Sequence, residues 1–110
     1  MSGKPRSIIT NDLEHDVMTG EDGVVIHHCI FGNGLRKLAD EDGLIIPLTP
    51  YHHSCAEHMI PASIHGGVIT ERLSKMVGQL AWEKEYYRKL SFENDPARDA
   101  FRKRYGISYL

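Results

Sequence analysis

Histidine is the residue type in this chain that could do chemistry. Seven histidines occur in 110 residues, and six of them lie between positions 27 and 65. Imidazole binds divalent transition metals, and its unperturbed pKa of about 6.5 suits proton transfer near neutral pH. Spacing alone leaves two interpretations equally open, a metal site or an ordinary scatter of histidines, because no Cys-x-x-Cys or His-Glu-x-x-His pattern is present. The clustered residues are His27, His28, His52, His53, His58 and His65.

The adjacent pair His27-His28 suggests a division of roles. Both lie in a β-branched, apolar run at 24–31, and consecutive side chains of a strand point to opposite faces unless the strand bends. One imidazole could therefore bind a metal while the other addresses the substrate. Metal-assisted hydrolysis needs this arrangement, because the metal stabilises charge while a nearby base takes a proton from water.

The elements that must position these histidines follow from the apolar pattern. Residues 24–31 predict a strand, and the apolar run 7–10 could pair with it. Residues 35–42 predict a short helix that Gly43 ends. Residues 44–48 predict a second strand, and Pro47 within it indicates an edge or a strand end.

The remaining chain predicts helices. Thr49 as N-cap and Pro50 at the first helical position place His52 and His53 in the first turn of a short helix, which Pro61 ends. Apolar residues three and four apart predict a long amphipathic helix from Val68 to about Leu90. Asn94-Asp95-Pro96 opens a last helix that Gly106 ends, with three residues sharing one face: Ala97, Phe101 and Tyr105.

Length and composition bound the function. A chain of 110 residues, 41% hydrophobic and 25% charged, suits one α+β domain over 1–110, with residues 1–6 disordered and 69–110 forming a helical C-terminal part. No apolar run is long enough to cross a membrane, and no signal peptide is evident. Two cysteines, Cys29 and Cys55, make no disulfide framework, which favours a reducing cytoplasm. Residues 71–110 carry nine Lys/Arg against six Asp/Glu, a basic balance that permits contact with phosphates.

Several short motifs occur in one order along the chain: His27-His28-Cys29-Ile30-Phe31-Gly32, Arg36-Lys37-Leu38-Ala39-Asp40, Gly43-Leu44, Leu48-Thr49-Pro50 and His53. With them the sequence resembles small phage and prophage HNH-type nucleases of the His-Me finger (ββα-metal) class. Ser63-Ile64-His65-Gly66 resembles the family's later Gly-Val-His-like tripeptide, and the ending at 101–110 is similar to its closing motif. The similarity therefore runs from about residue 24 to the C-terminus.

The resemblance implies a small ββα-metal core with C-terminal helices and hydrolysis of DNA phosphodiester bonds. It implies one divalent ion (Mg²⁺, Mn²⁺, Ni²⁺ or Zn²⁺), with His27 and His53 as ligands and His65 as a supporting ligand or phosphate contact. His28 would be the general base. The implied setting is phage or prophage DNA processing or recombination in the cytoplasm of a bacterial host. DNA is the expected partner, and a homodimer through the C-terminal helices is a further expectation.

The sequence departs from the family at two places. Residues 8–11 and His52 stand where many relatives carry zinc-binding cysteines, so no zinc knuckle is expected. Leu35 holds the place of the Asn that orients the base, and Asn33 is the nearest substitute. Arg36 and Lys37 are candidate phosphate contacts, or simply a solvated helix face. The alternatives are a non-catalytic metal- and nucleic-acid-binding module of the same fold, and a structural protein with incidental histidines.

Overall fold

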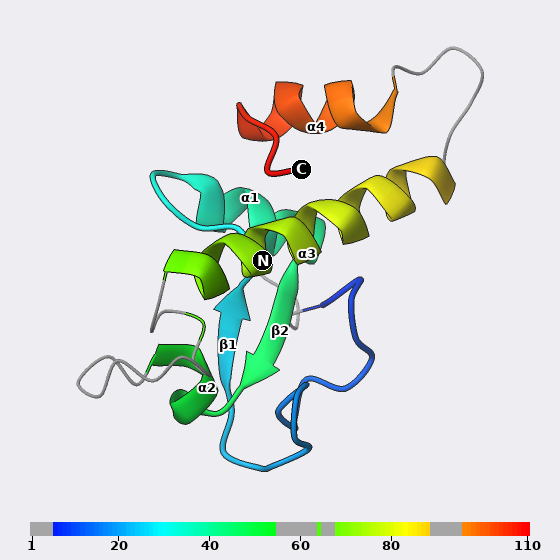
Figure 1. The fold of residues 1–110 in the computed structure, drawn as a ribbon. Coiled ribbons are helices and arrows are strands. Elements are labelled where there is room, and N and C mark those ends of the chain that lie inside the picture. The colour runs from blue at the N-terminus through cyan, green and yellow to red at the C-terminus, as the bar shows by residue number, and fades with distance from the viewer. Residues whose placement is uncertain (1–5, 55–63, 65–67, 89–95) are drawn as a thin grey trace.

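The chain folds as a small α+β structure. The computed structural model describes residues 6–54, 64, 68–88 and 96–110. Within these ranges a two-stranded antiparallel sheet is accompanied by four helices (Figure 1). The elements follow the order β1 (Val25–His28), α1 (Leu35–Asp42), β2 (Ile45–Leu48), α2 (Pro50–Ser54), α3 (Val68–Arg88) and α4 (Ala97–Tyr105). The α+β class predicted from the sequence is therefore confirmed.

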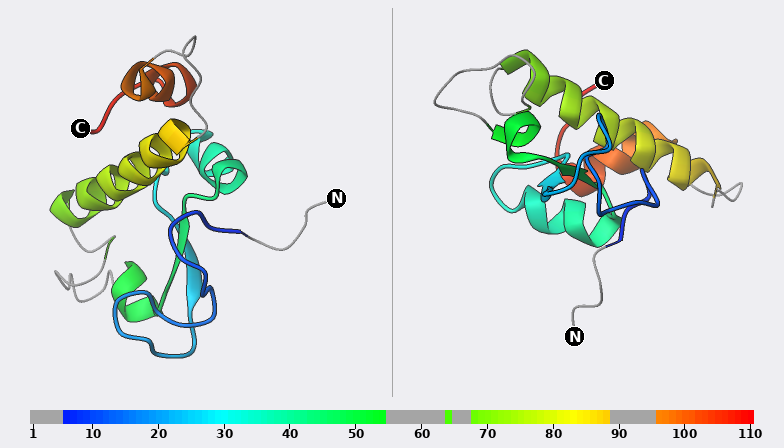
Figure 2. Two further views of the ribbon diagram at one scale, coloured as in Figure 1. Left: turned by 90° about the vertical axis from the view of Figure 1, so that its right-hand side faces the viewer. Right: turned by 90° about the horizontal axis from the view of Figure 1, so that it is seen from below.

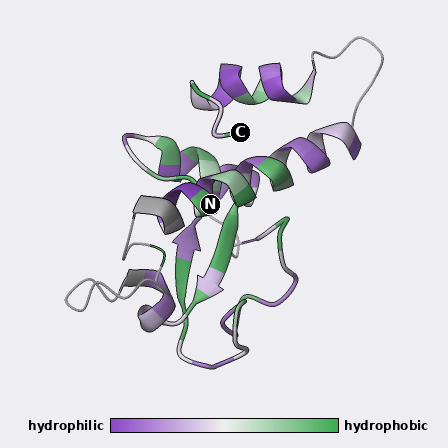
Figure 3. Cartoon of the chain, in the orientation of Figure 1, coloured by the Kyte–Doolittle hydropathy of each residue, from purple (hydrophilic) through white to green (hydrophobic). Residues whose placement is uncertain are grey.

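The sheet places the first histidine pair beside a buried strand. Strands β1 and β2 pair with Val25 opposite Leu48 and His28 opposite Ile45. All four residues of β2 are buried, whereas β1 is buried only at His27. Figure 3 shows the same contrast: β1 changes from hydrophobic to hydrophilic along its length, beside a mostly hydrophobic β2. The histidines thus lie at the polar end of an otherwise apolar ribbon.

The N-terminal segment runs along β2. The Ile8 amide donates to the Gly43 carbonyl at 2.9 Å, the Ser7 hydroxyl donates to the Ile45 carbonyl at 2.6 Å, and the Val17 amide donates to the Pro47 carbonyl at 2.9 Å. The apolar run 7–10, a candidate partner for the first predicted strand, therefore lies beside the start of the second strand and is not itself a strand.

Helix α1 has the bounds that its glycines predicted. Gly43 follows it in the left-handed conformation, with φ at 75°, which favours glycine over any residue with a Cβ. A Cβ on Gly43 would also lie 3.2 Å from the Ile8 amide nitrogen. The helix can therefore end there while the N-terminal segment passes close by.

Helices α1 and α3 lie on opposite sides of one end of the sheet, with α4 beyond them (Figure 2). Asp42, the last residue of α1, joins all three helices. Its carboxylate accepts hydrogen bonds from Trp82 Nε1 at 3.0 Å and from the Tyr105 hydroxyl at 2.7 Å, and Arg104 pairs with it at 2.6 Å. Burial and the Asp42 hydrogen bond raise the pKa of Tyr105 well above its usual value. The core around this junction comprises Cys29, Ile30, Ala39, Leu44, Ile46, Leu48, Phe101 and Tyr105.

Helix α3 forms where the sequence predicted it, but several residues of its apolar stripe are exposed, while Ala81 and Trp82 pack against the core. Leu73, Val77, Leu80 and Tyr87 are between 45 and 55% exposed, whereas Ser74, Gln79 and Glu83 are buried. The reason is that the inner face uses polar contacts: Gln79 Oε1 accepts a hydrogen bond from the Tyr109 amide at 2.6 Å, and Glu83 pairs with Arg98 at 3.0 Å. Apolar periodicity therefore predicted the helix, but it does not identify the side that faces the core.

A search of the helices in the described ranges found none with the length and apolar character needed to cross a membrane.

Candidate metal and nucleic-acid site

Three of the predicted site histidines line one pocket. His27 and His28 reach it from the end of β1, His53 reaches it from α2, and Arg36 reaches it from the first turn of α1. The pocket has a volume of about 300 Å³, and its other walls are Ile26, Phe31 and Gly32. Residues that are far apart in the sequence are therefore gathered around one solvent-accessible hollow.

His27 is the most buried of the three histidines, at 1% exposure. Its Nε2 lies 2.7 Å from the Ser74 hydroxyl oxygen, and that hydroxyl donates to the Cys29 carbonyl at 2.9 Å. The His27 and His53 rings meet edge to face, with centroids 5.2 Å apart. Two imidazoles, one from a strand and one from a helix, thus lie side by side.

His28 faces a different element from His27. Its Nε2 lies 3.4 Å from Asp40 Oδ1 on α1, and its side chain is 16% exposed. His28 is the last residue of β1, so the pocket extends round the strand end and both histidines line it while turning toward different helices. A more open hollow continues outward from His28 along Arg36, Lys37 and Asp40. This hollow carries the cationic side chains that a phosphate would meet.

His53 is placed by the start of α2. The Thr49 carbonyl accepts hydrogen bonds from the His52 and His53 amides, at 3.0 and 2.9 Å. Thr49 precedes the first helical residue, as predicted, but its hydroxyl donates to Asp16 Oδ2 at 3.1 Å. The start of α2 is therefore held by the segment that precedes β1.

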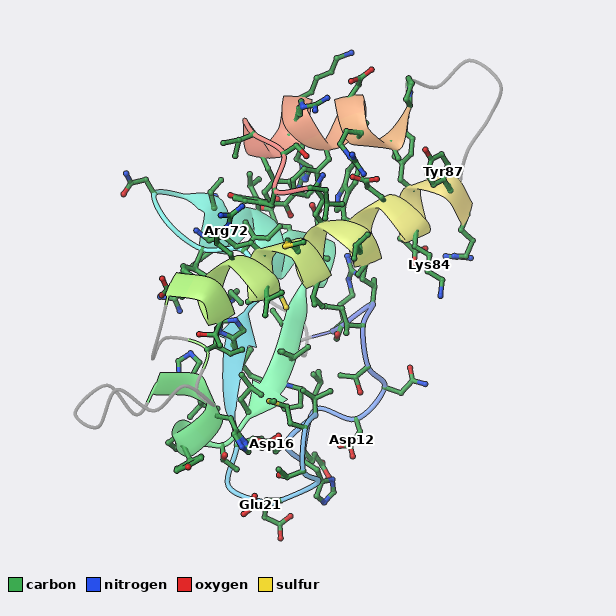
Figure 4. All side chains as sticks on the ribbon, in the orientation of Figure 1. Asp12, Asp16, Glu21, Arg72, Lys84 and Tyr87 are labelled. Carbon is green, nitrogen blue, oxygen red and sulfur yellow. The ribbon has the colours of Figure 1, made fainter. Side chains whose placement is uncertain are left out.

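Asp16 holds the start of α2 in place. Its carboxylate is fully buried, and Figure 4 places it between the N-terminal loop and the sheet, while Glu21 points outward. Oδ1 accepts from the amides of Met18 and Thr19, at 2.7 and 3.1 Å. Oδ2 accepts from the Thr49 amide at 2.7 Å and contacts His52 Nδ1 at 2.8 Å. Burial alone would raise the pKa of Asp16, but these hydrogen bonds outweigh burial and hold it well below its usual range.

Other predicted site residues lie apart from the pocket or outside the described residues. Asn33 is exposed and does not line the pocket, and Leu35 packs against the core. His65 lies outside the described residues, as do His58 and Cys55. Burial raises the pKa of the Cys29 thiol to about 12, so the thiol is protonated at neutral pH, and Cys29 does not line the pocket.

The candidate metal ligands in the described ranges are a pair of imidazoles. Within the part of the chain that the structure describes, no three His, Cys, Asp or Glu side chains are grouped to hold a metal ion. His27 and His53 fit two positions of a transition-metal site, because imidazole suits zinc, nickel and copper ions. Water or phosphate oxygens commonly complete such an open site.

No functional role was predicted from the sequence for three residues that contact the histidines of the site. Asp16 lies in a polar loop, Asp40 lies in the middle of a charged helix, and Ser74 lies on the polar side of a helix. Of these, Asp40 could have been found, since it is part of the Arg36–Asp40 motif. Comparisons with protein-family models, curated proteins and solved structures found no match to the chain.

Proposed function

We propose that this protein is a metal-dependent endonuclease that hydrolyses DNA phosphodiester bonds. The observation that carries the proposal is the pocket lined together by His27, His28, His53 and Arg36. The resemblance to HNH-type nucleases assigns His27 and His53 to the metal ligands and His28 to the base, and Arg36 is a candidate phosphate contact. Phage or prophage DNA processing is the setting that this resemblance favours.

His27 and His53 would hold the metal. A divalent ion bound there would stabilise the negative charge that develops on the phosphate. Each imidazole must be neutral to bind, and its ring must be held in one orientation. His27 meets the second requirement, because it is packed against the His53 and Phe31 rings and bonded to Ser74.

His28 would take the proton from the attacking water. The task requires a neutral imidazole at the edge of the solvent, and His28 is partly exposed where the pocket meets the outer hollow. Proton transfer leaves an imidazolium, which the Asp40 carboxylate at 3.4 Å stabilises electrostatically. Arg36 and Lys37 line the hollow beside His28 and would bind the phosphate.

The test is a plasmid-cleavage assay. Purified protein is incubated with supercoiled plasmid and Mg²⁺, Mn²⁺ or Ni²⁺, and nicked and linear DNA are measured over time. His28→Ala is expected to lower the rate by about 100-fold or more, the usual contribution of a general base. His15→Ala is the matched control, because His15 is an exposed histidine paired with Asp12 outside the pocket. Wild-type protein that leaves the plasmid as intact as His28→Ala does, with every metal, contradicts the proposal.

A second candidate is a non-catalytic module that binds metal and nucleic acid with the same fold. The observation that favours it is at Leu35, which packs against the core where the family carries an orienting Asn, while Asn33 is exposed. A metal-dependent rise in melting temperature and DNA binding, with no cleavage by the wild type, would identify this function.

A further inference from the structure

The amino group of Lys75 lies between two aromatic rings. Its Nζ is 4.5 Å from the centre of the Phe31 ring and 5.5 Å from the centre of the Tyr109 ring. Lys75 belongs to α3 and is only partly exposed, whereas Phe31 follows β1 and Tyr109 lies in the C-terminal segment. The face of an aromatic ring attracts a cation but has no net charge, so it holds the ammonium without neutralising it. The positive charge of Lys75 therefore remains available to a ligand.

Other cations of the helical part are neutralised by carboxylates. Four arginines form ion pairs with acidic side chains: Arg88, Arg98, Arg102 and Arg104 pair with Glu85, Glu83, Asp99 and Asp42. Lys75 takes part in no ion pair of the described residues, and Glu71, one turn earlier on α3, does not reach it. An ammonium that is partly removed from water is stabilised by a counter-charge. An external anion can supply this charge to Lys75.

The position of Lys75 connects it to the histidine pocket. Phe31 is a wall of that pocket, and the centres of the Phe31 and His27 rings are 5.9 Å apart. Since Nζ of Lys75 is 4.5 Å from the Phe31 centre, it lies within about 10 Å of the His27 ring. Successive phosphates of one DNA strand are about 3.4 Å apart along the helix axis. A strand with one phosphate in the pocket therefore has its next phosphates within reach of Lys75.

Gly78 allows α3 to lie this close to the end of β1. A Cβ at Gly78 would lie 3.0 Å from the Cys29 Cβ and 3.1 Å from the Ile30 Cγ1, which is tighter than most such contacts in proteins. Gly78 follows Lys75 by three residues, so the two lie on neighbouring turns of one side of the helix. The missing side chain lets α3 rest against residues 29 and 30, which brings Lys75 over the Phe31 ring.

A second cation extends the charged surface beyond Lys75. Arg72 is exposed, lies one turn earlier on α3, and takes part in no ion pair of the described residues. With residues 107–110 of the C-terminal segment it lines a hollow of about 330 Å³. Because Tyr109 both lines this hollow and contacts Lys75, the two cations lie on either side of one ring.

We propose that Lys75 and Arg72 form a second phosphate-binding surface, across the histidine pocket from Arg36 and Lys37, and that it binds the backbone of double-stranded DNA. The choice of DNA as the ligand rests on the proposed function, whereas the two cations without ion pairs are a property of the chain. Helices α1 and α3 lie on opposite sides of one end of the sheet, so a duplex over the pocket meets cations from both (Figure 2). Contacts of this kind position the backbone and do not read the base sequence.

The test measures DNA binding separately from cleavage. Binding of a short fluorescent duplex is followed by anisotropy between about 0.05 and 0.2 M salt, with EDTA present so that the DNA stays intact. The variants are Lys75→Gln, Arg72→Gln and the charge-conserving Lys75→Arg. Lys84→Gln is the matched control, because it removes the same charge from an exposed position of the same helix, far from Arg72 along α3 (Figure 4).

Each phosphate contact contributes about −0.9 to the slope of log K against log salt concentration. Lys75→Gln and Arg72→Gln should each make the slope shallower by about this amount and weaken binding about five- to tenfold near 0.1 M salt. Lys75→Arg should keep the wild-type slope, and Lys84→Gln should keep it with less than about a twofold change in affinity. Arg72→Gln changes an exposed residue, so it tests the surface even if Lys75→Gln folds poorly.

Equal salt slopes for wild type, Lys75→Gln and Arg72→Gln overturn the inference, and so does a wild type that binds no duplex. An equal loss of affinity in Lys75→Gln and Lys84→Gln also overturns it, because net charge and not position would then explain binding. If the wild type cleaves plasmid while the slopes are equal, the inference fails and the proposed function stands. If duplex binding depends on Lys75 and Arg72 but no metal supports cleavage, the DNA-binding surface is supported and the catalytic part of the proposed function fails.

Discussion

Replacing the buried carboxylate of Asp16 should destabilise the whole fold. Asp16→Asn keeps the size and shape of the side chain but replaces one oxygen with an NH₂ group. If that group faces Met18 and Thr19, two backbone amides lose their acceptor, and if it faces Thr49, one amide does. The second orientation costs less, because the Thr49 hydroxyl and His52 Nδ1 can each accept from an NH₂ group, so only the Thr49 amide is left opposite another donor.

The expected cost is about 3 kcal/mol. A buried donor without an acceptor costs about 1–3 kcal/mol, and the remaining hydrogen bonds lose the strengthening that a charged acceptor gave them. A loss of this size lowers the melting temperature of a domain near 100 residues by about 10–20 °C. Asp12→Asn is the matched control: it makes the same change at an exposed position of the same loop, and should barely move the unfolding midpoint.

The effect of Asp16→Asn should also depend on pH. The pKa of Asp16 is lowered in the folded protein, so its contribution to stability is fully present above the ordinary value of 3.8 and is lost as the pH falls below it. Urea unfolding followed by circular dichroism should therefore show a large gap between wild type and Asp16→Asn at pH 7, and a smaller gap at pH 3. If Asp16→Asn and Asp12→Asn unfold at the same urea concentration at pH 7, the reasoning about the buried carboxylate is refuted.

Two further predictions concern Asp40 and the exposed face of α3. Asp40→Asn should slow plasmid cleavage by about tenfold, because it removes the negative charge 3.4 Å from His28 Nε2, while metal affinity measured by calorimetry stays the same; an unchanged cleavage rate would show that Asp40 does not assist His28. Leu80→Glu should change the free energy of unfolding by less than about 0.5 kcal/mol, because Leu80 is 54% exposed. A larger loss that depends on protein concentration in urea titrations would instead mean that two copies bury this face between them.

Much of the fold could be predicted because local signals mark its boundaries. Gly34 and Gly43 flank α1, and both take the positive φ values that glycine favours. Pro50 begins α2, and Gly106 ends α4. The sequence also predicted that Ala97, Phe101 and Tyr105 share one face of α4, and all three are buried. Each of these features depends on residues within one or two turns of each other.

The inner face of α3 could not be predicted in this way. Periodicity identifies a stripe of apolar residues but not the surface against which a helix packs. Here the close approach at Gly78 and the hydrogen bonds of Ser74 and Gln79 outweigh the apolar stripe. These three contacts join residues 30 to 49 positions apart in the sequence, so no local pattern contains them.

The candidate site likewise combines residues that the sequence identifies with residues that it does not. The histidine pairs were visible because adjacent residues of one type are conspicuous, and His27, His28 and His53 do line one pocket. The residues that orient them were not visible. Asp16 contacts Thr49 and His52 across 33 and 36 positions, and Ser74 contacts His27 across 47. Serine and aspartate are common in loops and on helix surfaces, so their types alone give no reason to single them out.

The hydrogen-bonded chain from His27 through Ser74 to Cys29 has a consequence for how the protein is made. During synthesis, His27 and Cys29 are added long before Ser74, which lies 47 positions after His27. A nascent chain at that stage has the strand and its imidazoles but lacks the hydroxyl that contacts them. The His27 ring gains this contact only after α3 has been completed and has docked against residues 29 and 30. Truncated chains that lack α3 would therefore carry His27 without the hydroxyl that holds its ring in place.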